Sequence, residues 1–273
     1  MCNLSFCKIK PAVIILLLAY PFIILKAQEH ISDNENYIDS KIKFSLSALL
    51  YDNLELTHES KNILKSRMCP SSEATISYYK NIYDALGVNI GIGLGLAPYN
   101  FHYRYKSPDN QPYIGQISED FLSHYEYVQD LYVFPISLDY IHQVKVKPNL
   151  YFFSEIGLKI NLKVAYPYEI TTEVWYDLND STEIVLFDFF LNSTEKKNYL
   201  SYFLKFGVIK NTKKLNTLQC NFVLHYSPVK IGEGTYNFYY LPVESSGTVK
   251  QNLNYIGFEF TYGLTLTKKV RRE

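Results

Sequence analysis

The stretch GVNIGIGLGL, residues 87–96, decides the fold of this chain. From Val88 to Leu96 every second residue is a large aliphatic, and Asn89 and three glycines lie between them. Side chains on a β-strand point alternately to two faces, so this segment has one bulky apolar face and one small, polar face. The stretch therefore predicts a strand whose two faces meet different surroundings.

The same alternation recurs along the chain and predicts eight strands. Most of them are longer than the 5–6 residues typical of globular strands and long enough for a tilted strand to cross a bilayer. A change of parity at Ala97-Pro98 predicts a bulge or bend inside one strand. The predicted strands cover residues 41–52, 74–83, 88–105, 131–142, 149–165, 199–210, 215–229 and 253–267.

The connections between these strands are alternately short and long. Short turns on one side and long loops on the other are typical of an outer-membrane barrel. The short connections fall near 84–87, 143–148 and 211–214, and the long ones near 53–73, 106–130, 166–198 and 230–252. We therefore expect an all-β fold: an eight-stranded antiparallel up-and-down transmembrane β-barrel over 41–267. It would follow a short periplasmic segment over 28–40 and precede a basic tail over 268–273.

The N-terminus carries the features of an export signal. Residues 1–10 hold two lysines and no acid, and residues 12–25 are uninterrupted apolar residues. This run is shorter than the ~20 residues of a spanning helix, so it predicts a cleaved signal peptide over 1–27, with a retained anchor as the alternative. The whole chain has 27 basic and 27 acidic residues, and the signal contains three of the bases. This balance excludes the basic excess of a nucleic-acid binder.

Alternation alone does not show which face of a barrel is inside. A soluble, exported, lipocalin-like barrel that binds an apolar small molecule would alternate too, with its apolar side chains inside. The interior of an eight-stranded barrel is narrow, and the row of Asn89 and glycines fits there better than the aliphatic row. The 26 tyrosines also suit the aromatic girdles of a membrane barrel. We therefore expect the cell outer membrane, with lipid and lipopolysaccharide around the barrel and the barrel assembly machinery as partner during insertion.

Nine ionisable residues share the predicted lumen face. They could form a polar relay or narrow ion path, or a salt-bridge network that fills the lumen; we favour the network, because buried charges need partners. These residues are Lys43, Arg104, Asp139, Glu155, Lys159, Lys163, Lys205, His225 and Glu259.

No motif predicts catalysis, a cofactor or a metal. The chain has no GxSxG, HExxH or paired CxxC, and we expect Cys69 and Cys220 to be unpaired. The longest connection, 166–198, contains the apolar run IVLFDFFL at 184–191. This run either extends a strand or folds over the barrel mouth, or its loop binds a protein partner, with 230–252 as a second candidate.

Four segments carry a resemblance to a known family. They are GVNIGIGLGLAPYNFHY (87–103), LYVFPISLDY (131–140), LYFFSEIGLKINL (150–162) and LNYIGFEFTYGL (253–264). Across about 40–267 the chain resembles the PorT-like outer-membrane β-barrel family of Gram-negative bacteria. The resemblance implies a barrel without catalytic chemistry and, as for some members, a link to protein secretion. The chain departs from the common pattern of outer-membrane barrels by continuing past Leu266 into a basic tail rather than ending on an aromatic residue.

Overall fold

The structure is a computed structural model. It describes residues 36–59, 62–83, 86–104, 123–128, 132–163, 169–179, 182–193, 198–212, 216–239 and 245–270. The predicted signal peptide, 1–27, lies outside the described residues. Among them, no helix is long and apolar enough to cross a membrane.

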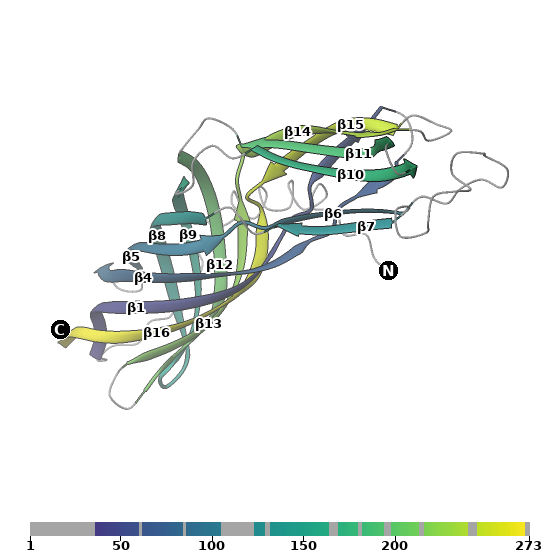
Figure 1. Ribbon diagram of the computed structural model, residues 1–273. Helices are drawn as coiled ribbons and strands as arrows, with labels where there is room; N and C mark the ends of the chain where they lie inside the picture. Colours follow the sequence, from purple (N-terminus) through teal and green to yellow (C-terminus); the bar gives the residue numbers. More distant parts are fainter. Residues whose placement is uncertain are drawn as a thin grey trace.

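Eight strands form a closed antiparallel barrel, which confirms the predicted fold class (Figure 1). Neighbours around the wall follow the order β1-β16-β13-β12-β9-β8-β5-β4, and β4 pairs with β1 to close it. The strands are β1 (Asn36–Tyr51), β4 (Cys69–Tyr83), β5 (Leu86–Leu96), β8 (Tyr132–Lys147), β9 (Leu150–Lys163), β12 (Asn198–Asn211), β13 (Thr217–Tyr226) and β16 (Tyr255–Val270).

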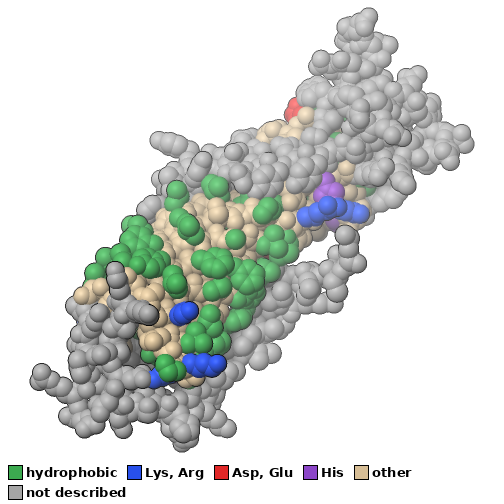
Figure 2. All heavy atoms as spheres, turned by 90° about the horizontal axis from the view of Figure 1, so that it is seen from below, with side chains coloured by type: hydrophobic (Ala, Val, Ile, Leu, Met, Phe, Trp, Pro, Cys, Tyr) green, Lys and Arg blue, Asp and Glu red, His purple; other side chains and the backbone are tan. Residues whose placement is uncertain are grey.

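The barrel is polar inside and apolar outside. On β1, Lys43, Ser45 and Ser47 are buried, whereas Phe44 and Leu46 point outward. Leu46 is 68% exposed, and similar exposed aliphatic and aromatic side chains occur on every barrel strand. In Figure 2 they gather over the barrel wall. The strict alternation of the sequence thus produces an apolar outer surface, and the row of Asn89 and glycines faces the interior, as predicted.

The long connections contain strands, so their prediction as loops was wrong. One additional sheet has the order β10-β11-β14-β15-β2 and the other has β3-β6-β7. Their strands are β2 (Glu55–His58), β3 (Leu64–Lys65), β6 (Tyr99–Arg104), β7 (Ser123–Val128), β10 (Glu169–Asn179), β11 (Thr182–Ser193), β14 (Lys230–Phe238) and β15 (Ser245–Asn252). We call these two sheets together the head.

The two head sheets pack face to face around an aromatic core. Phe101 of β6 stacks on Phe189 of β11 with ring centroids 4.1 Å apart, and Phe187 contacts Tyr103 at 4.8 Å. These four side chains are almost completely buried. The apolar run 184–191 therefore lies in β11, an inner strand of a small β-sandwich that extends away from the barrel (Figure 1).

The predicted strand 88–105 is two strands. β5 ends at Leu96, and β6 begins at Tyr99 and pairs with β3 and β7 rather than with the barrel. Pro98 has no N–H to donate, which favours this break in the ladder. The parity change therefore marks the point where the chain leaves the barrel. Arg104, the last residue of β6, lies outside the barrel wall, and its predicted place in the lumen was wrong.

The barrel also extends beyond its predicted ends. β1 begins at Asn36, which pairs with Val270 of β16, so the predicted segments 28–40 and 268–273 are partly strand. Cys69 and Cys220 are both free thiols; Cys69 is buried and Cys220 is exposed on the outer face.

Candidate functional site: the barrel interior

Apolar side chains close the barrel interior near both ends. Towards the chain termini, the inner seal consists of Tyr79, Ile141, Phe153 and Ile209. Gly87 makes room for it, because a Cβ at this position would lie 2.3 Å from the Tyr79 ring. Towards the head, the outer seal consists of Leu49, Tyr51, Cys69, Ala97, Tyr199, Val223, Ile231, Leu253 and Tyr255.

Between the seals lies an ion cluster of four side chains from four strands. The Lys205 ammonium is 3.0 Å from a Glu155 carboxylate oxygen and 3.1 Å from Glu259. Lys43 approaches the other oxygen of Glu155 at 3.5 Å. Glu259 also accepts a 2.8 Å hydrogen bond from Asn221. Together with Asn221 of β13, the cluster thus connects β1, β9, β12, β13 and β16 from the inside.

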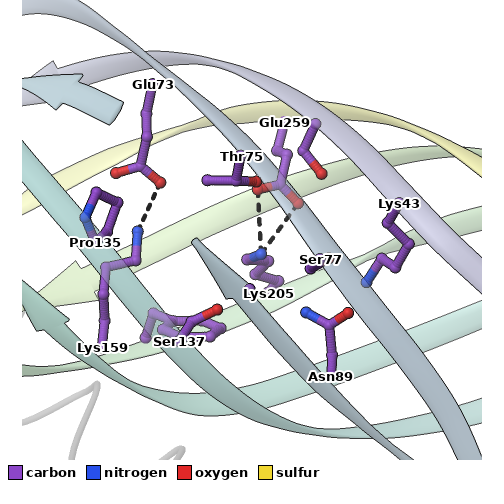
Figure 3. A pocket seen from close by; sticks show the side chains of 13 residues that line it. Lys43, Glu73, Thr75, Ser77, Asn89, Pro135, Ser137, Lys159, Lys205 and Glu259 are labelled. Atoms are coloured by element: carbon purple, nitrogen blue, oxygen red, sulfur yellow. Dashed lines mark hydrogen bonds and ion pairs between the residues drawn. The ribbon is translucent and has the colours of Figure 1, made fainter. Parts of the chain in front are cut away.

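A second ion pair lies nearer the head. The Lys159 ammonium is 2.7 Å from Glu73 and donates a hydrogen bond of 2.8 Å to the Tyr255 hydroxyl. Figure 3 shows this pair across the interior from Lys205 and Glu259. Since Tyr255 belongs to the outer seal, this pair connects the polar interior to the apolar layer above it.

Asp139 and His225 are buried at separate places. Asp139 accepts a 2.7 Å hydrogen bond from the Asn89 amide. The His225 ring stacks on Tyr255, with centroids 4.1 Å apart and planes 4° from parallel. Its two nitrogens lie 2.7 Å from the Leu253 carbonyl oxygen and 2.8 Å from the Ser201 hydroxyl. Each of these polar side chains therefore has a partner inside the barrel.

The charges of the described interior balance. Four lysines face four carboxylates, and a single unpartnered charge in such a place would cost several kcal/mol. Among these side chains lies a cavity of about 10 Å³, room for one water molecule, lined by residues of β1, β4, β5, β8, β9, β12 and β16 (Figure 3). The eight charged side chains are Lys41, Lys43, Lys159, Lys205, Glu73, Asp139, Glu155 and Glu259.

Of the nine residues predicted to face the lumen, seven lie inside the barrel and Arg104 does not. Lys163, also expected there, belongs to β9, but its side chain is outside the described part. Lys41 and Glu73 are also buried inside the barrel and were not among the predicted lumen residues. Lys41 has the parity of Lys43, and Glu73 lies one residue before its predicted strand, so extending the alternation would have identified both.

His225 and Ser201 lie as close together as a catalytic base and nucleophile, but they lack the solvent access and the carboxylate partner of a catalytic pair. Ser201 is completely buried and His225 is 2% exposed, so no substrate reaches them. The second nitrogen of His225 faces a backbone carbonyl rather than a carboxylate. Within the described residues, no group of three or more His, Cys, Asp or Glu side chains could hold a metal ion. The described interior is thus closely filled with side chains that contact one another.

Comparisons with known proteins find similar solved structures but no matching family. No family model and no curated protein matches the chain. Among solved structures, the outer membrane protein OprG from Pseudomonas aeruginosa has 10% identity over 84% of this chain and 97% of its own, with a TM-score of 0.44. Neisserial surface protein A has 12% identity over 82% and 97%, with a TM-score of 0.37. The outer membrane protein AlkL has 11% identity over 89% and 99%, with a TM-score of 0.34.

Proposed function

We propose that this chain is an outer-membrane protein whose sealed barrel anchors an extracellular head. The observation that carries the proposal is the polarity of the barrel: charged side chains inside and exposed aliphatic and aromatic side chains outside. In hydrocarbon, a closed barrel pairs every backbone group and needs only an apolar outer face. A lipocalin-like barrel would need the reverse polarity, so the soluble alternative is not favoured.

The topology gives the barrel a direction. The ends of β1 and β16 lie at one end of the barrel, and the head lies at the other (Figure 1). In outer-membrane barrels the short turns face the periplasm and the long connections face outward. On this rule the head is extracellular.

The head is the part suited to meeting a partner. The barrel interior is occupied by paired charges between two apolar seals, so we propose neither an open pore nor catalysis. The segments expected to bind a protein partner, 166–198 and 230–252, supply four of the eight head strands. The PorT-like resemblance supports an interaction or secretion-associated role for such a surface.

Fractionation and electrophoresis test the membrane part of this proposal. The protein should appear in outer-membrane fractions, and the unheated, folded form should migrate faster on SDS gels than the heated form. Recovery as a soluble periplasmic protein would contradict it.

Two further measurements test the sealed lumen and the outward head. Planar bilayers containing the purified protein should show no steady channel current. Proteases added to intact cells should cleave the head. Sustained channel currents would contradict the sealed lumen. Cleavage of the head only after the cells are opened would contradict its extracellular position.

A further inference from the structure

The surface of the three-stranded head sheet carries a basic patch, formed by Lys65 and Arg67 beside His102. Lys65 of β3 pairs with His102 of β6, so their side chains lie on the same face of the sheet. The opposite face, with Leu64 and Tyr103, is buried in the head core. Lys65 and Arg67 are exposed. The patch therefore points away from the head core.

Side-chain hydrogen bonds hold this patch in place. Asn100 accepts a 2.9 Å hydrogen bond from the Arg67 backbone N–H. Ser66 donates one of 2.7 Å to the Asn100 carbonyl oxygen and accepts one of 2.9 Å from the Leu54 backbone. The short segment that carries both cations is thus fixed to β6, which gives the patch a defined geometry.

The positive charge of the patch is not neutralised by the described residues. Neither Lys65 nor Arg67 has a carboxylate partner within the part of the chain that the structure describes. Burial, and then the positive charges of Arg67 and Lys65, lower the pKa of His102. On the five-stranded sheet, by contrast, Lys230 lies 3.4 Å from Glu233.

The patch lies a short distance along the chain from the barrel strand β5. β5 ends at Leu96, six residues before His102. At ~3.3 Å per residue and a tilt of ~40°, these residues span about 15 Å of height. A phospholipid headgroup layer is only ~5–7 Å thick. With the exposed side chains Ile90, Ile92 and Leu94 of β5 in hydrocarbon, as the proposed membrane location requires, the patch lies above that layer.

We propose that Lys65 and Arg67 bind the phosphate and carboxylate groups of the lipopolysaccharide core sugars. This inference rests on the proposed membrane location and names a partner for the outward head. The core sugars stand above the acyl chains at the height of the patch, and guanidinium and ammonium groups bind such anions well. The lipid A phosphates, at the acyl boundary, are too low.

The test measures binding of two probes to the folded protein in detergent: lipopolysaccharide with a complete phosphorylated core, and lipid A alone. A cation near an anionic surface strengthens binding by about fivefold. The double variant Lys65→Gln/Arg67→Gln should therefore bind full-core lipopolysaccharide about 25-fold more weakly at low salt. Its binding of lipid A should equal that of the unaltered protein.

Two controls distinguish specific binding at the patch from a general effect of positive charge on the protein. Lys230→Gln/Lys250→Gln removes the same charge from the other sheet and should leave binding unchanged, and Lys65→Arg/Arg67→Lys should retain it. Three results would overturn the proposal. The two double variants could lose the same amount of lipopolysaccharide binding, the Lys65→Gln/Arg67→Gln variant could lose none, or that variant could lose lipid A binding to the same extent. Heat-modifiable migration of each variant reports the barrel separately, so failure of this site is distinguishable from failure of the membrane assignment.

Discussion

Glu155 is the residue on which the ion cluster depends, because it faces both Lys205 at 3.0 Å and Lys43 at 3.5 Å. Glu155→Gln should leave the interior with an unbalanced positive charge and lower the free energy of unfolding by about 3–5 kcal/mol. Urea unfolding in lipid bilayers measures this change. Lys230→Gln, which removes an exposed ion pair, should cost less than about 1 kcal/mol. Similar values for the two variants would show that the cluster contributes little.

Gly157 tests how tightly the interior is filled. A Cβ at this position would lie 2.3 Å from the Phe203 ring, whereas a Cβ at Gly95 would meet its nearest atom at 3.4 Å, an ordinary contact. Gly157→Ala should therefore cost about 1–3 kcal/mol of overpacking, and Gly95→Ala should be nearly neutral. Unfolding in bilayers compares them. Equal stability would mean that the ring has room to move.

Residue-level prediction succeeded where alternation was unbroken. Lys43, Glu155 and Glu259 lie in long alternating runs, and parity alone placed them inside. The prediction for Arg104 was wrong because the two-residue alternation continues along a strand whichever sheet that strand joins. Pairing partners are set by contacts distant in sequence, and no local pattern reports them.

The head depends on β11, whose aromatic side chains fill its core. Phe189→Ala removes the ring that stacks on Phe101 and should destabilise the head by about 3–5 kcal/mol. Limited proteolysis should then cut the head faster, while heat-modifiable migration of the barrel stays unchanged. Phe190→Ala, the neighbouring half-buried position on β11, should have a much smaller effect. If both variants resist protease like the unaltered protein, the aromatic core does not hold the head together.

At the scale of elements, the eight barrel strands were predictable and the eight head strands were not. Barrel strands are long and alternate for nine or more residues, whereas β3 has only two residues and β2 has four. β11 does alternate, with Phe187, Phe189 and Leu191 buried and Phe190 half-buried, but alternation does not report that a strand leaves the barrel and joins a second sheet. The run IVLFDFFL did reveal an apolar segment, but not that β6 would supply its partner surface.

For the whole molecule, the outer face of the barrel decides between membrane and water. Ile92 lies on this face with 52% of its side chain exposed. In a bilayer, Ile92→Lys near the midplane should cost about 2–4 kcal/mol, so assembly into the outer membrane should fall. In water the same change would leave the yield of folded protein unchanged or raise it by improving solubility. The two locations therefore predict different effects on yield. Thr57→Lys, on the exposed head strand β2, is the matched control and should insert normally. Normal heat-modifiable protein at full yield from Ile92→Lys would place this face in water, and the proposed role of the barrel as an anchor would be wrong.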